Sequence, residues 1–558
     1  MAAAVAVLLG SAAGAQVTVV PATPQVGSSN PATAEPPVTR PSTTPCVVQL
    51  FQNLQFADFN LKSFSYAPPA ACPGPWAKVV FTADFTVTAG RQFDRTAAFY
   101  LGHANIYYGT TAEPRRTLSP SWHVERDVTD LSPIFQSAQT GEANIGNFVG
   151  VSGGVTYDGI IFANAALEFY PANVANPAPR TPDIVVPVNG PGGDAGTLST
   201  TASEITQTLN LPRNVESAYL DVIAQSQSND EFWYTCVPNN ETGPLQSCGN
   251  TAFRETEVSI DGQPAGVAPV YPWIYTGGID PYLWEPIPGI QTLDFVPYRV
   301  DLTPFAGVLS DGNPHTVGVS VYNANSYFLA TANLLVYTDH GGSTVTGGVL
   351  SNTLGMPTPM VEDNVTSPSA GVYTGTVDTT ASRSFTISGY VNTSHGRVQT
   401  TVNQTVSFAN DQNFTINDTQ YIQDITQNTS LDSATLTKSG GITSTSGQHF
   451  RYPLTVDITF AVNPDGSFYQ TTTAGQGFQK KTANATSGVG AVTSSIREDD
   501  QTTDTLSWDA NGSFLGPSNS TASQSYVGRN SLGGCYSRTI TAAAQKLTSV
   551  TDGQGCGQ

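Results

Sequence analysis

Hydrophobic and polar residues alternate in many short segments of this chain, which is the period of a β-strand with one buried face. In one segment, four hydrophobic side chains share a face: Phe93, Ala97, Phe99 and Leu101. In this register Asp94 lies on the opposite face, at the leading edge of the strand. We therefore expect the Asp94 carboxylate to point away from the core of its own sheet.

A second segment places two carboxylates in a similar way. Val258 and Ile260 share a face that Glu255 and Glu257 do not share, and an Asp-Gly pair typical of a hairpin turn follows them. The two glutamates are therefore expected to point away from the core, toward solvent or toward a cleft.

The alternation predicts an all-β protein, because there is neither a strong internal repeat nor a long amphipathic helix. We predict two tandem antiparallel jelly-roll-like β-sandwiches at residues 45–193 and 194–345. A further β-rich C-terminal region follows at residues 346–558, where polar Thr, Ser, Asn and Gly residues dominate. Ligands often bind at domain interfaces, which allows the first two domains to build one cleft together.

The first 44 residues are expected to lie outside these domains. Residues 1–15 are an apolar run ending in a small-residue cleavage pattern, typical of a signal peptide, and the missing basic start is consistent with truncation. Residues 16–44 are rich in Pro, Thr and Ala, which predicts a disordered linker. No later stretch approaches the roughly 18 apolar residues of a membrane-spanning helix. We expect a secreted protein, extracellular or periplasmic, without a membrane span.

Composition excludes one class of partner and indicates the compartment. The 22 Lys and Arg residues against 43 Asp and Glu residues give a net charge of −21, whereas a nucleic-acid-binding protein needs a basic face. We expect no nucleic acid partner and a monomeric protein. Six cysteines without CxxC spacing favour structural disulfides over a zinc site. Spacing leaves the pairing open, and our expectation is the sequential set: Cys46 with Cys72, Cys236 with Cys248, and Cys535 with Cys556.

Carboxylates and aromatic side chains gather in residues 228–286, although only 12% of the chain is charged. Aromatic rings stack on the apolar faces of sugars, and carboxylates bind hydroxyl groups or transfer protons. Trp233 and Trp284 are therefore predicted sugar platforms. The acids predicted to contact substrate are Asp230, Asp280, Glu285 and, from the first domain, Glu113.

Several segments of the chain resemble the peptide:N-glycosidase A family (glycoamidase A). Three of them are residues 90–95 (GRQFDR), 229–234 (NDEFWY) and 275–286 (YTGGIDPYLWEP), and the matches span most of residues 45–550 in the family's order. The resemblance implies hydrolysis of the amide between asparagine and the first N-acetylglucosamine of an N-glycan, which leaves aspartate. It also implies N-glycosylated peptides or proteins as substrates, no metal or other cofactor, and activity at acidic pH.

This family is distantly similar to the bacterial F-type peptide:N-glycosidase, which is built of two jelly-roll sandwiches. That enzyme has an essential Asp before an Arg at the start of a first-domain strand, and Asp94-Arg95 resembles this element. Its second essential acid precedes a strand that begins with Phe-Arg, but the matching position here is near Asn250. Glu231 and Glu255 are the best substitutes for that acid.

Amide hydrolysis requires an activated water, stabilisation of the oxyanion and a proton for the departing nitrogen. We assign Asp94 to water activation, and Glu231 and Glu255 to the amide or the first sugar. Arg95 is expected to hold Asp94 ionised or to meet the oxyanion.

Two other functions share these sequence features. A secreted lectin-like β-sandwich protein would present aromatic and acidic side chains to sugars without turnover. A glycosidase would use paired carboxylates to cut a sugar–sugar bond instead of the amide.

Overall fold

The computed structural model describes residue 17, residues 23–113 and residues 115–557. The strands of this part of the chain pair antiparallel in six sheets, with only a short α-helix and short 3₁₀ segments between them. The predicted all-β fold is confirmed, whereas the jelly-roll connectivity remains a prediction. The predicted signal peptide at residues 1–15 lies outside the described residues. None of the helices in the described ranges has the length and apolar composition needed to cross a membrane.

The first sandwich is formed by two four-stranded sheets that enclose a core of aromatic side chains. One sheet has the order β1 (Cys46–Phe56), β10 (Ile161–Pro171), β3 (Trp76–Val87) and β6 (Ser121–Asp127). The other has the order β2 (Lys62–Tyr66), β7 (Gln139–Ile145), β4 (Thr96–Leu101) and β5 (Ala104–Thr110). A small hairpin lies beside them, formed by β8 (Gly150–Ser152) and β9 (Val155–Tyr157).

The second sandwich also has two sheets. The first is ordered β11 (Ile184–Val188), β19 (Tyr327–Thr338), β14 (Val215–Gln227) and β17 (Tyr298–Asp301), and β12 (Gly196–Leu198) pairs with β19. The second is ordered β13 (Glu204–Leu209), β18 (His315–Tyr322), β15 (Glu255–Ile260) and β16 (Gln263–Pro269). Because β11 pairs with β19, it belongs to this sandwich and not to the first region, where the expected boundary at residue 193 placed it.

The helical segments are confined to connections. The α-helix α1 covers Ala306–Leu309. The 3₁₀ segments are η1 (Thr129–Leu131), η2 (Ile134–Gln136), η3 (Ser228–Asp230), η4 (Trp233–Thr235), η5 (Thr303–Phe305) and η6 (Gln554–Cys556).

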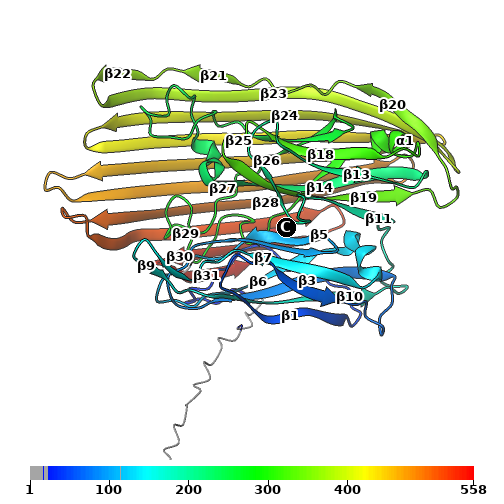
Figure 1. Cartoon of the computed structure of the whole chain (residues 1–558), viewed down its shortest axis with the longest axis horizontal. Coiled ribbons are helices and arrows are strands. Elements are labelled where there is room, and N and C mark those ends of the chain that lie inside the picture. Colours follow the sequence, from blue (N-terminus) through cyan, green and yellow to red (C-terminus); the bar gives the residue numbers. More distant parts are fainter. Residues whose placement is uncertain (1–16, 18–22, 114, 558) are drawn as a thin grey trace, which may run out of the picture.

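The C-terminal region forms one twelve-stranded sheet of unusually long strands, which run across the upper part of Figure 1. Its order is β20 (Thr346–Asn352), β23 (Val372–Thr393), β24 (Gly396–Asn417), β25 (Gln420–Ser439), β26 (Ile442–Val462), β27 (Phe468–Thr486), β28 (Gly490–Trp508), β29 (Phe514–Asn530), β30 (Cys535–Ala543) and β31 (Lys546–Asp552). The short strands β21 (Met360–Asp363) and β22 (Thr366–Ser369) pair with β23. The predicted β-rich C-terminal region is thus confirmed as a single sheet.

The large sheet covers the second sandwich, with which it shares one hydrophobic core. In Figure 1 its long strands lie across the second sandwich, and the first sandwich, in blue, lies below. Buried amide side chains of the sheet also donate to backbone carbonyls of the second sandwich: Gln404 to Val267 O of the edge strand β16, and Asn410 and Gln412 to Tyr234 O and Cys236 O of a connection. Irregular loops expose backbone carbonyls, so a face that buries them must supply donors.

The described residues of the predicted linker are packed against the folded domains. Ala34 is fully buried and its backbone N–H donates to Gln524 Oε1 of the large sheet at 2.6 Å. Arg40 pairs with Glu125 of β6 at 2.8 Å. The linker prediction is therefore wrong for residues 23–44, because a Pro-rich extended chain can lie in a groove without forming a strand. We refer to residues 23–44 as the strap.

The three predicted disulfides are confirmed: Cys46–Cys72, Cys236–Cys248 and Cys535–Cys556. The Cys236–Cys248 bridge closes a short loop in the long connection between β14 and β15. This connection carries Glu231.

The contact between the large sheet and the second sandwich can be tested at Gly389 of β23. A Cβ at this position would lie 1.8 Å from Pro304 O, whereas a Cβ on Gly348 of β20 would meet nothing within 4 Å. We expect Gly389→Ala to lower the Tm by several degrees, since overpacking costs about 1–3 kcal/mol. Gly348→Ala is the control, and equal Tm values for the two variants would contradict this packing.

Candidate functional site

The residues predicted to start the chemistry lie where the two sandwiches meet. Asp94 and Arg95 directly precede β4. In β4, Ala97 and Phe99 belong to the core of the first sandwich, whereas the intervening Ala98 packs into the core of the second. The alternation of β4 therefore directs the face that includes Asp94 toward the second sandwich.

A chain of hydrogen bonds fixes Asp94 between two segments. The backbone N–H of Gly277 donates to Asp94 Oδ2 at 2.8 Å, and the Asp94 N–H donates to Glu113 Oε2 at 3.4 Å. The Glu113 N–H donates to Thr276 Oγ1 at 2.8 Å, and this hydroxyl donates to Thr111 O at 3.0 Å. These contacts join the residues after β5 to the connection between β16 and β17. We call residues 276–285 of this connection the site loop.

Residue 277 donates its N–H to Asp94, and it also lacks room for a side chain. A Cβ at this position would lie 2.1 Å from Glu113 Oε2 and 3.3 Å from Asp94 Oδ2. Real Cβ atoms do not approach other atoms this closely, so the backbone of the site loop reaches both acids because residue 277 has no side chain.

Three carboxyl groups at this place influence one another. Burial, followed by the charges of Asp94 and Glu113, raises the pKa of Glu231 to about 7. Burial and the charge of Asp94 likewise raise the pKa of Glu113 to about 7. Burial also raises the pKa of Asp94, but the Gly277 N–H and the charge of Arg95 oppose that increase. Asp94 is therefore the best stabilised carboxylate of the three, and the other two retain protons into the neutral range.

Arg95 combines burial with an unused donor. Its Nε is buried and has no hydrogen-bond partner among the described residues, and its guanidinium lies 5.8 Å from the centre of the Phe93 ring. Burial lowers the pKa of Arg95, while the charges of Asp94 and Glu113 raise it. A buried, charged donor without a partner is suited to an oxyanion.

Arg115 was not singled out in the sequence. Its Nε donates to Glu285 Oε1 at 2.8 Å and its NH2 group donates to Pro281 O at 3.0 Å. Its guanidinium also lies 4.2 Å from the centre of the Tyr282 ring and 3.9 Å from Glu113. Arg115 thus holds the site loop to the first sandwich, and Glu285 is its ion-pair partner.

The structure does not bring Glu255 to this group. Glu255 and Glu257 are both bound to Arg383 of the large sheet, and Glu255 is buried. Their side chains do leave the core of their own sheet, as expected, but the large sheet covers that face. No local sequence pattern indicates that the large sheet covers this face.

Two further predicted contacts with substrate are core residues. Asp230 is fully buried and accepts hydrogen bonds from the Arg254 side chain and from the backbone N–H groups of Asn325 and Ser326. Trp233 is also fully buried, beside Phe408 of the large sheet. Neither residue is available to a sugar in this structure, which corrects both predictions.

Trp284 and Asp280 are buried within the site loop. The Trp284 indole N–H donates to Gly278 O at 3.0 Å, and Asp280 accepts from the Tyr282 N–H at 2.9 Å. The predicted roles as a sugar platform and as a hydroxyl ligand are therefore not supported, since both side chains shape the loop from within.

Sequence reasoning missed the residues that act through the backbone or through loop geometry. Thr276, Gly277 and Arg115 belong to this class. The only local signal was the Gly-Gly pair at residues 277–278, because paired glycines mark places where the backbone must approach another group closely.

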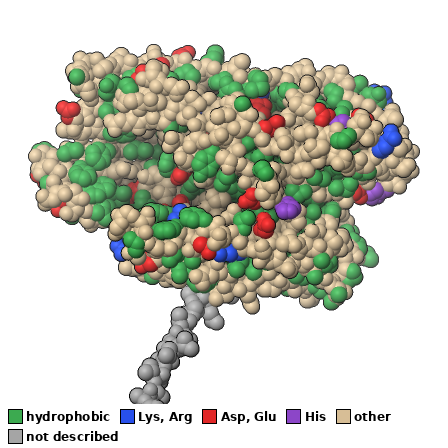
Figure 2. All heavy atoms as spheres, viewed as in Figure 1, with side chains coloured by type: hydrophobic (Ala, Val, Ile, Leu, Met, Phe, Trp, Pro, Cys, Tyr) green, Lys and Arg blue, Asp and Glu red, His purple; other side chains and the backbone are tan. Residues whose placement is uncertain are grey.

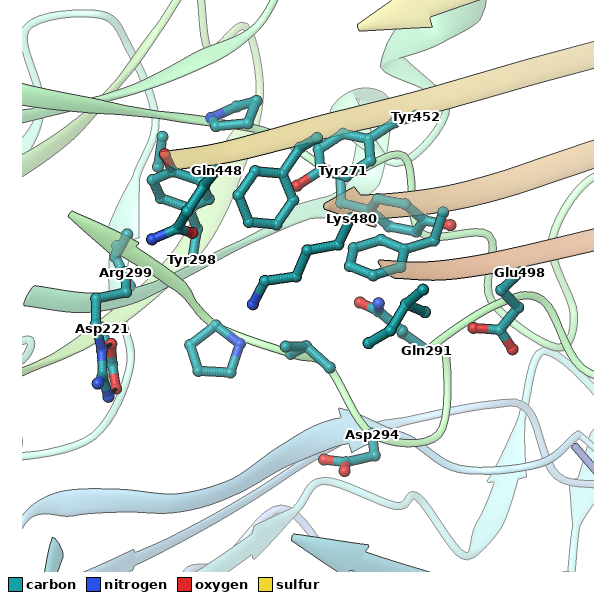
Figure 3. Close-up of a pocket in the computed structure, with 18 of the residues that line it drawn as sticks. Asp221, Tyr271, Gln291, Asp294, Tyr298, Arg299, Gln448, Tyr452, Lys480 and Glu498 are labelled. Atoms are coloured by element: carbon teal, nitrogen blue, oxygen red, sulfur yellow. Dashed lines mark hydrogen bonds and ion pairs between the residues drawn. The ribbon is translucent and has the colours of Figure 1, made fainter. Parts of the chain in front are cut away.

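A cavity of about 630 Å³ lies elsewhere, between the large sheet and the sandwiches (Figure 3). Tyr271, Tyr452 and Lys480 line its centre, Glu498 lies at one end, and Asp221 and Arg299 lie at the other (Figure 3). Asp94, Glu113 and Glu231 do not line it. The reactive acids and this cavity are separate features.

The surface view shows one face of the molecule. Figure 2 shows a recess between the layer of the large sheet and the first sandwich, with acidic side chains along it and few basic ones. Within the described ranges, no three His, Cys, Asp or Glu side chains are arranged to hold a metal ion.

Comparison with solved structures gives only distant likenesses. PNGF-II has a TM-score of 0.35 and 13% identity, over 53% of this chain and 65% of that chain. PNGase F, a glycosylasparaginase from Flavobacterium meningosepticum, has a TM-score of 0.34 and 11% identity, over 53% of this chain and 96% of that chain. Likenesses of this size carry no argument about the site.

Sequence comparisons are more specific. Residues 35–354 match the family described as peptide N-acetyl-beta-D-glucosaminyl asparaginase amidase A, and residues 376–454 match the PNGase A C-terminal domain. The peptide-N4-(N-acetyl-beta-glucosaminyl)asparagine amidase A of Prunus dulcis is 30% identical over 483 residues, covering 83% of this chain and 82% of that protein. The matched residues include the Asp94–Glu113–Gly277 contacts and Glu231. The chain therefore belongs to the peptide N-acetyl-beta-D-glucosaminyl asparaginase amidase A family.

Proposed function

We propose that this protein hydrolyses the amide bond between asparagine and the first N-acetylglucosamine of N-glycopeptides, with Asp94 as the base. The observation that carries the proposal is the partly buried contact of Asp94 with Gly277 and Glu113 at the junction of the two sandwiches. Family membership supplies the substrate class.

The different electrostatic environments of Asp94 and Glu231 indicate which of them is the base and which is the acid. Asp94 has a backbone donor and the charge of Arg95 to stabilise its ionised form, so it is suited to removing a proton from water. Glu231 has neither, and the charges of its two neighbours favour its protonated form. Neighbouring acids whose environments separate their pKa values are suited to one base and one acid.

The reaction then proceeds by addition of water. Asp94 takes a proton from water as the oxygen attacks the side-chain carbonyl carbon of the substrate asparagine. Arg95, whose buried Nε is unpaired, stabilises the oxyanion. As the carbon–nitrogen bond breaks, Glu231 gives its proton to the departing nitrogen. The products are aspartate in the peptide and a glycosylamine, which loses ammonia in water.

Glu113 has a positioning part in this scheme. It accepts the Asp94 N–H and lies 3.9 Å from Arg115, so it links Asp94 to the arginine that holds the site loop. We propose that Glu285 acts through the same arginine.

We also propose that the protein is secreted and works as a monomer at acidic pH. Three disulfides fit folding in an oxidising compartment. The raised pKa values of Glu113 and Glu231 support function below neutral pH, because the proton donor must be protonated.

Mass spectrometry of a treated N-glycopeptide tests the activity and its base. We expect an increase of about 1 Da at the asparagine together with release of the intact glycan, and a loss of about 10²–10⁴-fold in kcat for Asp94→Asn. Asp418→Asn, in an exposed turn of the large sheet, is the control. A residual N-acetylglucosamine on asparagine would indicate a glycosidase, and an unchanged glycopeptide would indicate a lectin. Full activity of Asp94→Asn would overturn the assignment of the base.

The proposed acid predicts the alkaline limb of the pH profile. The protonated form of Glu231 is present below its pKa of about 7 and is lost as the pH rises through that value. We therefore expect kcat/KM to fall above about pH 7, and Glu231→Gln to make this limb less steep while lowering the maximal rate. An alkaline limb that persists unchanged in Glu231→Gln would assign the proton to another group.

The close approach of the site loop predicts a loss of activity in Gly277→Ala. The added methyl group would displace Glu113 or the loop, and a misplacement of about 1 Å can cost about 10²-fold in rate. Gly243→Ala is the matched control, since a Cβ there would meet nothing within 4 Å. Equal kcat values for Gly277→Ala and the wild type would contradict the geometry of the site.

A further inference from the structure

One face of β28 in the large sheet carries three buried carboxyl groups. Glu498, Asp500 and Asp504 are 2%, 1% and 0% exposed, and Thr502 lies between the last two on the same face. None of the ion pairs formed within the described residues includes any of these three acids. Burying an ionised carboxylate without a cation costs free energy, so these acids are expected to hold protons.

Two of these β28 side chains hold the site loop. The Thr502 hydroxyl donates to Leu283 O at 2.6 Å. The carboxyl groups of Asp504 and Asp280 lie close enough to share a side-chain hydrogen bond if one proton lies between them. The large sheet thus reaches the loop whose Gly277 N–H binds Asp94.

The bond between the two aspartates requires a proton. Asp280 Oδ2 and Asp504 Oδ2 are both buried, and neither receives a hydrogen bond from an N–H or O–H donor of the described residues. Their other oxygens are occupied, since Asp280 Oδ1 accepts from the Tyr282 N–H and Asp504 Oδ1 accepts from the Ser520 hydroxyl. Two carboxylates in this position repel each other, whereas a shared proton joins them.

The charged groups that face Asp280 and Asp504 do not remove the need for a shared proton. Arg115 is the cation that influences both aspartates, but it is already bound to Glu285, and the charge of Asp504 in turn raises the pKa of Glu285. The pair therefore holds one proton rather than none.

A second pair of carboxyl groups lies between the same strand, β28, and the strap. Glu498 and Glu35 lie close enough to share a side-chain hydrogen bond at the wall of the cavity in Figure 3, where Glu498 lies beside Gln291. The charges that act on this pair come from Asp294, Asp499 and Asp500. The groups around it are thus acidic, and protonation is again what allows the contact.

A short hydrogen-bonded turn connects Asp280 to Gly277, the residue that binds the Asp94 carboxylate. The Asp280 N–H donates to Gly278 O at 2.7 Å, and the Leu283 N–H donates to Asp280 O at 3.1 Å. Only two residues separate Asp280 from Gly277, which binds Asp94. A displacement of Asp280 therefore moves the Gly277 N–H directly.

We propose that Asp504 of the large sheet is a positioning residue for the amidase site, because the proton that it shares with Asp280 fixes the site loop against Asp94. This inference rests on the proposed function, to which it adds a role for the C-terminal sheet. The loop is held in acid and is released as the pair loses its proton.

The direction of the pH effect follows from the two pKa values. Burial, together with the charge of Asp504, raises the pKa of Asp280 to about 7, and burial raises the pKa of Asp504. The folded protein binds more protons here than the unfolded chain, so the stabilising contact is fully present in acid. It is lost as the pH rises through about 7.

The test compares the isosteric Asp504→Asn with Asp504→Ala and the wild type. The asparagine amide donates to Asp280 at any pH, whereas alanine cannot. Asp499→Asn is the matched control, because Asp499 lies on the same strand, faces the other way and pairs with Arg497. Two measurements are made from pH 5 to pH 8: hydrogen exchange of residues 276–286, corrected for intrinsic rates, and kcat/KM on an N-glycopeptide.

For the wild type and Asp499→Asn, we expect protection of the loop to fall about tenfold between pH 7 and pH 8. In Asp504→Asn, protection should stay constant and the alkaline limb of kcat/KM should become less steep, because Glu231 alone then loses a proton in this range. In Asp504→Ala, protection should be low throughout. The comparison of the wild type with Asp504→Asn is sufficient if the alanine variant fails to fold.

Loop protection that is independent of pH in the wild type would overturn the inference, as would profiles of Asp504→Asn that match the wild type in both measurements. Hydrogen exchange needs no substrate. A wild-type protein that releases no glycan would therefore contradict the proposed function, while the exchange data would still decide the role of Asp504.

Discussion

Carboxyl groups buried where the layers of this protein meet cannot all be ionised, and much of the structure follows from this constraint. At the junction of the sandwiches, Asp94 receives the Gly277 N–H at 2.8 Å and the influence of Arg95. Glu113 receives longer contacts, from the Asp94 N–H at 3.4 Å and from Arg115 at 3.9 Å, and neither kind of contact lowers the pKa of Glu231. Negative charge is therefore best stabilised on one acid, and the protons remain on its neighbours. In the mechanism that we propose, this division supplies a base and an acid without a histidine.

The three layers produce this burial by covering one another. The alternation of β4 turns one face into the first sandwich and the other toward the second. The large sheet then covers the second sandwich and satisfies its loop carbonyls with buried amide side chains. A loop between two layers is held at both ends, which explains how a segment without strands can present a single N–H to Asp94.

The sequence was informative where a pattern is local. Strand alternation placed Asp94 at the edge of a strand and away from its own core, and the all-β fold and the sequential disulfides were predicted correctly. Resemblance to a known family added Glu231, which the structure brings to the same junction. Positions of this kind depend on neighbours in the chain, and so they can be read from it.

The remaining predictions were wrong because contacts with distant parts of the chain determine whether those side chains are buried. Glu255 looked like a cleft residue because its strand alternates, but Arg383 from the large sheet covers it. Trp233 and Trp284 looked like sugar platforms because they lie beside acids, yet both indoles are buried. No local pattern shows which face a third layer will cover. Gly277 and Thr276 escaped notice because they act through a backbone N–H and through a loop hydroxyl.

The proposed mechanism requires the amide of an N-glycosylated asparagine to react at Asp94, between the sandwiches. A crystal structure of the Asp94→Asn variant with a chitobiosyl-asparagine peptide would locate that amide. We expect the amide carbon to lie beside residue 94, with Glu231 near the amide nitrogen and the Gly277 N–H still directed at residue 94. A bound peptide whose amide lies in the cavity of Figure 3, or on the surface away from Glu113 and Glu231, would contradict it.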